Sequence, residues 1–218
     1  MLYCRLPPKL CIHGSNLLLE FLMIELCFNL KEINLHATNF ITFEYSNTKM
    51  SEIVFDHVPL LQNLCIGLYG DNVIPYVFGE LTKDLHQLKR LSFITGAEYY
   101  QIRRAAFDTF DGQRAAKASG VHHSQLKEVE FCSFGGSQNE VDFALYILKT
   151  AVVLERMYIS ICPFSWTKTI PLWDEEKQNM ICKQFQEQAL SKNVVVIMQL
   201  LRSPMYRPLD QRWRPVST

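Results

Sequence analysis

The feature that most constrains the fold is an apolar triplet, spaced three and then two residues apart, that recurs along the sequence. Side chains two residues apart point to the same face of a strand, so the last two residues of each triplet predict a strand with one buried face. Seven copies occur: Leu30-Ile33-Leu35, Phe40-Phe43-Tyr45, Met50-Ile53-Phe55, Leu61-Leu64-Ile66, Leu88-Leu91-Phe93, Leu126-Val129-Phe131 and Leu154-Met157-Ile159. Leu10-Ile12 has the form of a shortened eighth copy.

The spacing between copies limits what each coil of the chain can contain. The central residues Ile33, Phe43, Ile53 and Leu64 follow one another at steps of 10, 10 and 11 residues. Leucine-rich coils usually take about 20 to 29 residues, so these steps are too short for a helix in every one. We therefore expect two extended segments per coil in the N-terminal half.

Residues 123–159 predict a strand, a turn, a capped helix and a second strand. Gly135-Gly136 permits a sharp turn, and Ser137 and Glu140 have the S-x-x-E spacing of a capping box. The helical i, i+3, i+4, i+7 spacing is then kept by Val141, Ala144, Leu145 and Leu148. We expect this helix to pack on two parallel strands and to join them by a right-handed crossover.

The remaining segments are less regular. The pattern lapses at residues 97–120, which indicates a missing coil or a divergent insertion, with a weak helix from Tyr99 to Phe110. Asp174 is a candidate N-cap for a helix whose inward positions are Ile181, Phe185 and Ala189. Val194 to Leu200 predicts a buried strand that closes the sheet, and residues 201–218 predict a mobile basic tail.

The segments LKEVEF, NEVDFALYILKTA and LERMYI resemble the FBD domain of plant F-box and leucine-rich-repeat proteins, and the resemblance spans residues 10 to 200. It implies an α/β leucine-rich-repeat solenoid with a mainly parallel sheet and an FBD-like helix-strand cap at the C-terminus. The expected regions are a leucine-rich-repeat region at 1–120, an FBD-like domain at 121–200 and the tail at 201–218.

This resemblance also implies a function, namely the substrate-recognition part of a ubiquitin-ligase receptor whose F-box docks to the ligase adaptor. Family F-boxes have a helical segment near a Leu-Pro start and a basic end that contains Trp. Leu6-Pro7 is present, but no Trp precedes Trp166, so an F-box is not evident. Adaptor binding is therefore expected only with an F-box upstream. The alternative is an F-box-less scaffold or competitor, or a truncated gene product.

Charge and cysteine usage bear on the class of partner and the compartment. Lys plus Arg and Asp plus Glu both total 22, so no charge excess favours nucleic acid or an anionic membrane. The apolar run Leu17 to Leu26 is broken by Glu20 and Glu25 and is too short to cross a bilayer. Seven cysteines without a C-x-x-C pair favour a reducing compartment. We expect an intracellular protein, cytoplasmic and/or nuclear.

Motifs for catalysis, cofactors or metals are not evident, so we expect a non-enzymatic protein without a cofactor or a metal. His122-His123 and Cys132 keep a thiol-dependent hydrolase as a distant alternative, but thiol catalysis also needs an orienting group and an oxyanion site. Cys11 and His13 would face one side of a strand. A lone cysteine is usually a small buried hydrophobe, so metal binding is not expected there.

Acidic residues alternate outward from the predicted core positions. They are Glu32, Glu44, Glu52 and Asp56 in the early strands, and Glu128 and Glu130 in the FBD-like segment. A solvated strand face is one interpretation. The other is an acidic sheet face that selects a basic partner protein, because like charges aligned on neighbouring strands repel one another unless a basic ligand is present.

Overall fold

The computed structural model of the 218-residue chain describes residues 7–14, 17–37, 39–47, 51–67, 85–94, 123–134, 136, 138–161, 175–189 and 191–200. Within these residues the elements, in chain order, are β1 (Lys9–Gly14), β2 (Phe21–Glu25), β3 (Glu32–Ala37), β4 (Thr42–Ser46), β5 (Glu52–His57), β6 (Asn63–Gly67), β7 (Arg90–Ile94), β8 (Glu128–Phe134), α4 (Gln138–Thr150), β9 (Arg156–Ile161), α5 (Glu175–Gln188) and β10 (Val195–Leu200).

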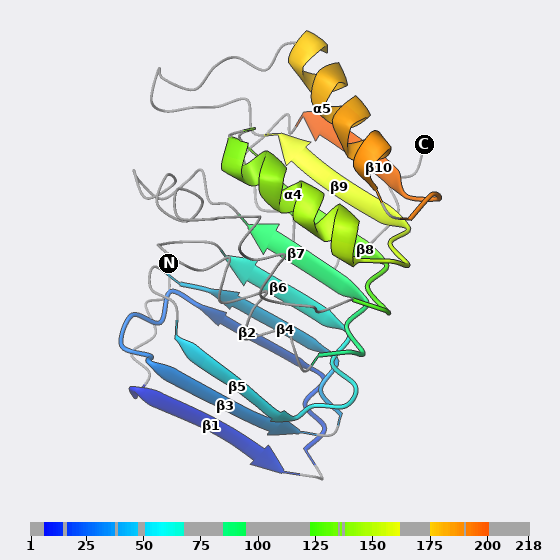
Figure 1. Cartoon of the computed structure of the whole chain (residues 1–218). Coiled ribbons are helices and arrows are strands. Elements are labelled where there is room, and N and C mark those ends of the chain that lie inside the picture. The colour runs from blue at the N-terminus through cyan, green and yellow to red at the C-terminus, as the bar shows by residue number, and fades with distance from the viewer. Residues whose placement is uncertain are drawn as a thin grey trace.

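The strands form two parallel sheets (Figure 1). One has three strands in the order β1-β3-β5, and the other has seven in the order β10-β9-β8-β7-β6-β4-β2. From β1 to β6, strands that follow one another in the chain alternate between the two sheets. Each short step from β3 to β6 therefore holds one extended segment, as predicted, and the chain is α/β with mainly parallel sheet and few helices in the part that is described.

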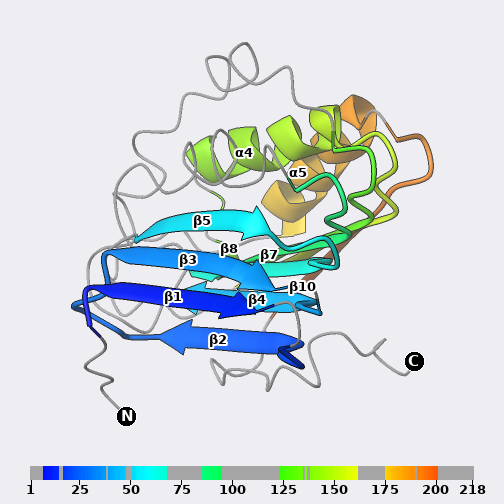
Figure 2. The same cartoon turned by 90° about the horizontal axis from the view of Figure 1, so that it is seen from below.

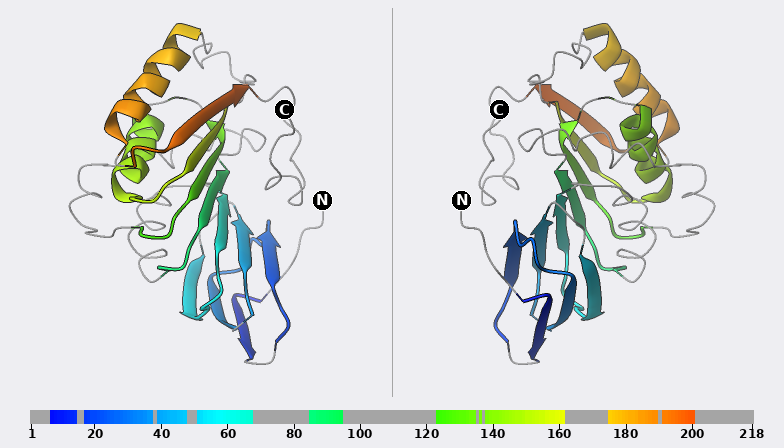
Figure 3. Two further views of the ribbon diagram at one scale, coloured as in Figure 1. Left: turned by 90° about the vertical axis from the view of Figure 1, so that its right-hand side faces the viewer. Right: turned by 90° about the vertical axis from the view of Figure 1, so that its left-hand side faces the viewer.

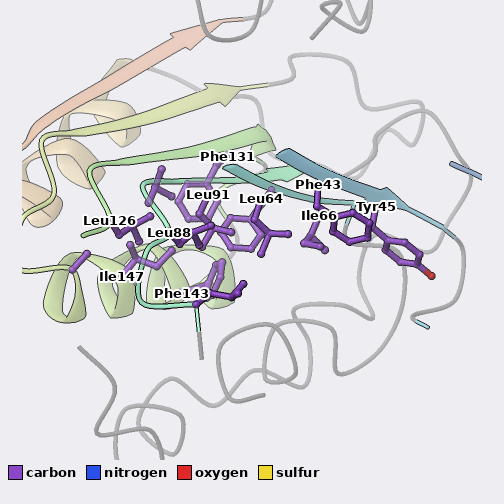
Figure 4. Packing of buried hydrophobic residues seen from close by; sticks show 14 of the residues in the cluster. Phe43, Tyr45, Leu64, Ile66, Leu88, Leu91, Leu126, Phe131, Phe143 and Ile147 are labelled. Carbon is purple, nitrogen blue, oxygen red and sulfur yellow. The ribbon is translucent and has the colours of Figure 1, made fainter. Parts of the chain in front are cut away.

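The three-stranded sheet and the helices cover the same face of the seven-stranded sheet (Figures 2 and 3). Phe43 of β4 meets the edge of Phe55 of β5 at a centroid distance of 5.6 Å. Farther along the same face, Phe93 of β7 meets Phe143 of α4 at 5.1 Å. One apolar core thus runs along the sheet (Figure 4). Strands cover its N-terminal end and helices cover its C-terminal end.

Tight turns precede four of the five triplets that begin with a leucine. Leu30, Leu61, Leu88 and Leu154 each donate their backbone N–H to the carbonyl three residues earlier, at 3.0 to 3.2 Å. These leucines are 0 to 4% exposed, so the turn places an apolar anchor in the core just before the strand starts. Burial of a leucine side chain contributes about 1.5–3 kcal/mol.

Shared carbonyls align the neighbouring strands where they begin. The backbone N–H groups of Lys89 and Arg90 both donate to the carbonyl of Gln62 at 2.9 Å. Those of Lys127 and Glu128 then donate to the carbonyl of Lys89 at 2.9 and 3.0 Å. A carbonyl oxygen has two lone pairs and can accept both bonds. The repeated arrangement sets the lateral register along the seven-stranded sheet.

The β8-α4-β9 unit confirms the predicted parallel neighbours. Val129 of β8 lies opposite Met157 of β9 in a parallel pair, and α4 connects the two strands. Gly136, just before the helix, has a φ of 69°, the left-handed conformation that glycine adopts at low cost. Ser137 lies outside the described residues, and its capping role stays a prediction.

Helix α4 buries more than the predicted stripe. Val141, Ala144, Leu145 and Leu148 are buried, as expected. Phe143 and Ile147 were not in that stripe, yet both are 0% exposed. The ring of Phe143 meets Phe93 and Phe131 at 5.1 and 5.6 Å, so it is a main contact of α4 with the sheet. So many residues of this helix are apolar that more than one side has the i, i+4 spacing. Only the packing identifies the side that faces the sheet.

The C-terminal helix and strand are of the predicted types, but the strand is less buried than predicted. Ile181 and Phe185 of α5 are 3% and 0% exposed, and Ala189 packs against the core. Strand β10 pairs in parallel with β9 and closes one edge of the sheet. It is not the buried strand that was predicted, because it is an edge strand and Val195 is 54% exposed.

Strand β2 was missed at the sequence level. The run from Leu17 to Leu26 was considered only as a membrane segment, although Leu19, Leu22 and Ile24 repeat the triplet spacing. The predicted Tyr99–Phe110 helix, the Asp174 cap and the 201–218 tail lie outside the described residues. The regions 1–120 and 121–200 share one sheet, because β7 pairs directly with β8.

We expect Phe143→Ala to lower the free energy of unfolding by about 3–5 kcal/mol, because it opens a cavity between α4 and two buried rings. Urea unfolding followed by circular dichroism measures the effect. Val153→Ala is the matched control, since Val153 is 39% exposed just after α4 and should change stability by no more than about 0.5 kcal/mol. Similar losses in both variants would contradict this packing of α4.

Candidate functional site

The polar residues with the densest contacts lie where strands β6 to β9 begin. The parallel register aligns Asn63, Arg90, Glu128 and Arg156 across these four strands. Their side chains alternate outward, because the next residue of each strand, such as Leu91 or Val129, is buried in the core. The row is therefore held in place by the same contacts that form the sheet.

Glu128 is the centre of this row. Its carboxylate accepts hydrogen bonds from Arg90 Nε at 2.8 Å on one side and from Arg156 on the other. The Glu128 side chain is only 9% exposed, whereas the two guanidinium groups are 36% and 44% exposed. The hydrogen bond and charge of Glu128 raise the pKa of Arg156 above its usual value. The nearly buried carboxylate of β8 thus holds two partly exposed cations, one on each neighbouring strand.

A second polar row precedes the strands. Lys127 Nζ contacts Glu155 Oε1 at 2.7 Å, and Lys89 Nζ donates to Gln62 Oε1 at 3.1 Å. The hydrogen bond from Lys127 lowers the pKa of Glu155. Both pairs are exposed, so each contributes little to stability.

The two rows line a shallow pocket of about 410 Å³, here called the strand-start groove. Its lining residues are Gln62, Asn63, Lys89, Arg90, Lys127, Glu128, Glu155 and Arg156. Four of these are cations and two are carboxylates, so the groove carries a positive excess. Such a lining offers many hydrogen-bond donors to an acidic or amide-rich segment, and contains no thiol, hydroxyl or imidazole that could act as a nucleophile or a base.

The predicted acidic face is divided between two sheets. Glu32, Glu52 and Asp56 belong to β3 and β5 of the three-stranded sheet, whereas Glu44, Glu128 and Glu130 belong to β4 and β8 of the seven-stranded sheet. The outer faces of the two sheets point away from their shared core in opposite directions. The alignment of all these acids on one face is therefore wrong, because strands that follow one another in the chain enter different sheets.

On the three-stranded sheet the acids meet basic or imidazole groups. Glu32 contacts Lys9 Nζ at 2.5 Å, which raises the pKa of Lys9. Glu52 lies opposite Glu32 in the register, and Asp56 Oδ2 lies 2.8 Å from His36 Nδ1. The like-charge pair of Glu32 and Glu52 therefore has Lys9 beside it.

On the seven-stranded sheet the acids are largely enclosed. Glu44 is 3% exposed, so it is not a surface group. Glu130 accepts a hydrogen bond from Ser92 Oγ at 3.2 Å. With Glu128 held between two arginines, none of these three presents an open carboxylate face. Whether any of the six acids binds a partner stays a prediction.

The cysteine and histidine candidates are placed apart. The backbone N–H of His123, which precedes β8, donates to the carbonyl of Thr150, the last residue of α4, at 3.1 Å. Cys132 lies near the other end of β8. Extended backbone from Glu128 to Cys132 covers about 13 Å, so His123 and Cys132 do not form a catalytic pair. His122 lies outside the described residues.

Metal and membrane signals are lacking in the part of the chain that is described. No group of three or more His, Cys, Asp or Glu side chains there is arranged to hold a metal ion. Among the same residues, no helix is both long enough and apolar enough to span a bilayer.

Comparison with known proteins relates one segment to a family. Residues 122–159 match the FBD family, and within this range lie β8, α4 and the first part of β9. The match supports a relationship to FBD-containing F-box proteins and confirms the FBD resemblance of this segment. No curated protein and no solved structure matches the chain.

We expect Glu128→Gln to lower the free energy of unfolding by about 1–3 kcal/mol. The change leaves two guanidinium groups without the carboxylate between them, and the loss stays below that of a fully buried pair because water reaches both groups. Chemical denaturation at low ionic strength measures it. Glu155→Gln, which breaks only an exposed pair, should have the smaller effect, and the reverse order would contradict the central role of Glu128.

Proposed function

We propose that this chain is a non-enzymatic recognition module of an F-box-type ubiquitin-ligase receptor, which holds a target protein for modification. The FBD match at residues 122–159 supports the proposal, because this domain is associated with F-box proteins. The observation that carries it is the pairing of β8 with β7, since the matched segment continues the sheet of the N-terminal half. The two parts then act as one binding surface.

The N-terminal half is, in this proposal, a leucine-rich-repeat solenoid of the plant F-box type. Lateral partners support it, because Ile33 lies opposite Ile53 and Phe43 lies opposite Leu64. These partners are 20 and 21 residues apart, at the short end of the range of about 20 to 29 residues for such coils. Stacked coils of this kind present long, regular surfaces for protein binding.

The strand-start groove is the proposed contact with the target. It spans residues of both parts, from Gln62 and Lys89 to Lys127 and Arg156. Its positive excess suits an acidic segment of the target. Because its hydrogen-bond donors stand in fixed rows, they orient the bound segment more than they strengthen its binding. Glu32, Glu52 and Asp56 stay a proposed second contact for a basic group of the target, on the opposite side of the molecule.

A scaffold or competitor without an F-box is the second candidate. The described part of residues 7–67 forms strands β1 to β6, not the helical surface with which family F-boxes dock. A thiol-dependent hydrolase is not favoured, because His123 and Cys132 lie toward opposite ends of β8.

We expect residues 1–218 alone not to be retained on immobilised ligase adaptor, because the described part of residues 7–37 forms strands and not a helical docking surface. Fusion of a family F-box to the N-terminus should restore retention. Pull-down with purified proteins measures both. Micromolar binding by the unfused chain would show that residues 1–30 dock to the adaptor after all.

We also expect the double change Lys89→Glu and Lys127→Glu in the F-box fusion to abolish ubiquitylation of its targets in cells. Quantitative proteomics of ubiquitylated peptides measures this against the unchanged fusion. Lys183→Glu is the matched control, because Lys183 is 77% exposed on α5, away from the groove. Equal sets of ubiquitylated targets for the double variant and the control would show that the groove does not bind the target.

A further inference from the structure

Three histidines form a row on the outer face of the three-stranded sheet. His13 of β1 lies opposite His36 of β3, which lies opposite His57 of β5 (Figure 2 shows these strands side by side). The ring centroids are 6.1 Å apart for the first pair and 5.3 Å for the second. The three residues are 23 and 21 residues apart in the chain, so the row follows from the coil length.

A register shift brings a carboxylate to this row. The pairing of β3 with β5 shifts between Leu35 and His36, so His57 rather than Asp56 lies opposite His36. Asp56 stays adjacent, with Oδ2 2.8 Å from His36 Nδ1. A carboxylate at Nδ1 favours the tautomer with the proton on Nδ1, which leaves the lone pair of Nε2 free to bind a metal. Carboxylate-histidine-metal arrangements are built in this way.

The spacing of His36 and His57 fits a shared metal ion. An ion bound to Nε2 at about 2.0–2.1 Å lies about 3.2 Å from the ring centroid. Two centroids 5.3 Å apart can then share an ion at an N–metal–N angle of about 110°, close to the tetrahedral value. The rings are tilted by 37° and half-buried or exposed, so small side-chain rotations can turn both nitrogens to one point. The wider pair of His13 and His36 would require an angle of about 145°.

We propose that His36 and His57 form a surface site for a divalent transition-metal ion such as Zn²⁺, with Asp56 as the positioning residue. Imidazole nitrogen is a preferred ligand of Zn²⁺, Cu²⁺ and Ni²⁺ and not of Mg²⁺ or Ca²⁺. The described residues offer no group of three ligands, so the site has two protein nitrogens and water completes the coordination. None of these three residues lines the strand-start groove, so the site is separate from it.

Calorimetric titration of the whole chain with Zn²⁺ tests the site, with Mg²⁺ as the negative control. We expect one Zn²⁺ per chain, and at least tenfold weaker binding for His36→Asn and for His57→Asn. Asp56→Asn should weaken binding about tenfold, in line with other outer-shell partners, and Asp56→Glu should restore part of it. Cu²⁺ bound to the wild type should show an electron paramagnetic resonance spectrum with two imidazole nitrogens.

Three control variants locate the site. His13→Asn, Cys11→Ser and His86→Asn should keep the wild-type affinity, and all variants should keep the wild-type urea midpoint. Loss of binding in Cys11→Ser would assign the ion to a thiol and overturn the proposal. So would equal losses in His13→Asn and His57→Asn, unchanged affinity in the variant that lacks both His36 and His57, or the absence of Zn²⁺ binding by the wild type.

Discussion

Lateral hydrogen bonding between neighbouring parallel strands is the interaction on which the rest of this structure depends. Where the strands of the large sheet begin, one carbonyl accepts two N–H groups of the next strand, as Gln62 does from Lys89 and Arg90. This holds residues at the same position of neighbouring strands side by side. The leucine anchors, the aromatic core and the polar rows are consequences of the same alignment, because each recurs at the same position of neighbouring strands.

The same core accepts two kinds of cover. At the N-terminal end the three-stranded sheet lies over β4, where Phe55 packs on Phe43. At the C-terminal end α4 takes its place, and Phe143 packs on Phe93. A short step of about ten residues allows only a second strand, whereas the longer connection after β8 holds a helix. The FBD-like segment is therefore added to the sheet without a break, and the strand-start groove runs across the junction.

Electrostatics on the surface also follows the rows. On the large sheet Glu128 separates Arg90 and Arg156. On the small sheet Glu32 and Glu52 are direct neighbours, and Lys9 contacts Glu32 from the other side. The groove has a positive excess, and the outer face of the small sheet carries Glu32 and Glu52.

The sequence by itself determined most of the strand positions, the short steps between them and the β8-α4-β9 unit, because apolar spacing is a local property that burial requires. It also contained the triplet spacing of β2 at Leu19, Leu22 and Ile24. This spacing was not recognised, because it lies in an apolar run where polar and apolar residues do not alternate. Only the tertiary structure decided which strands are neighbours, and so divided the predicted acidic residues between two sheets. It alone joined His36 to His57 and Glu128 to its two arginines, since residues 21 to 38 apart in the chain meet only through the register of the sheets.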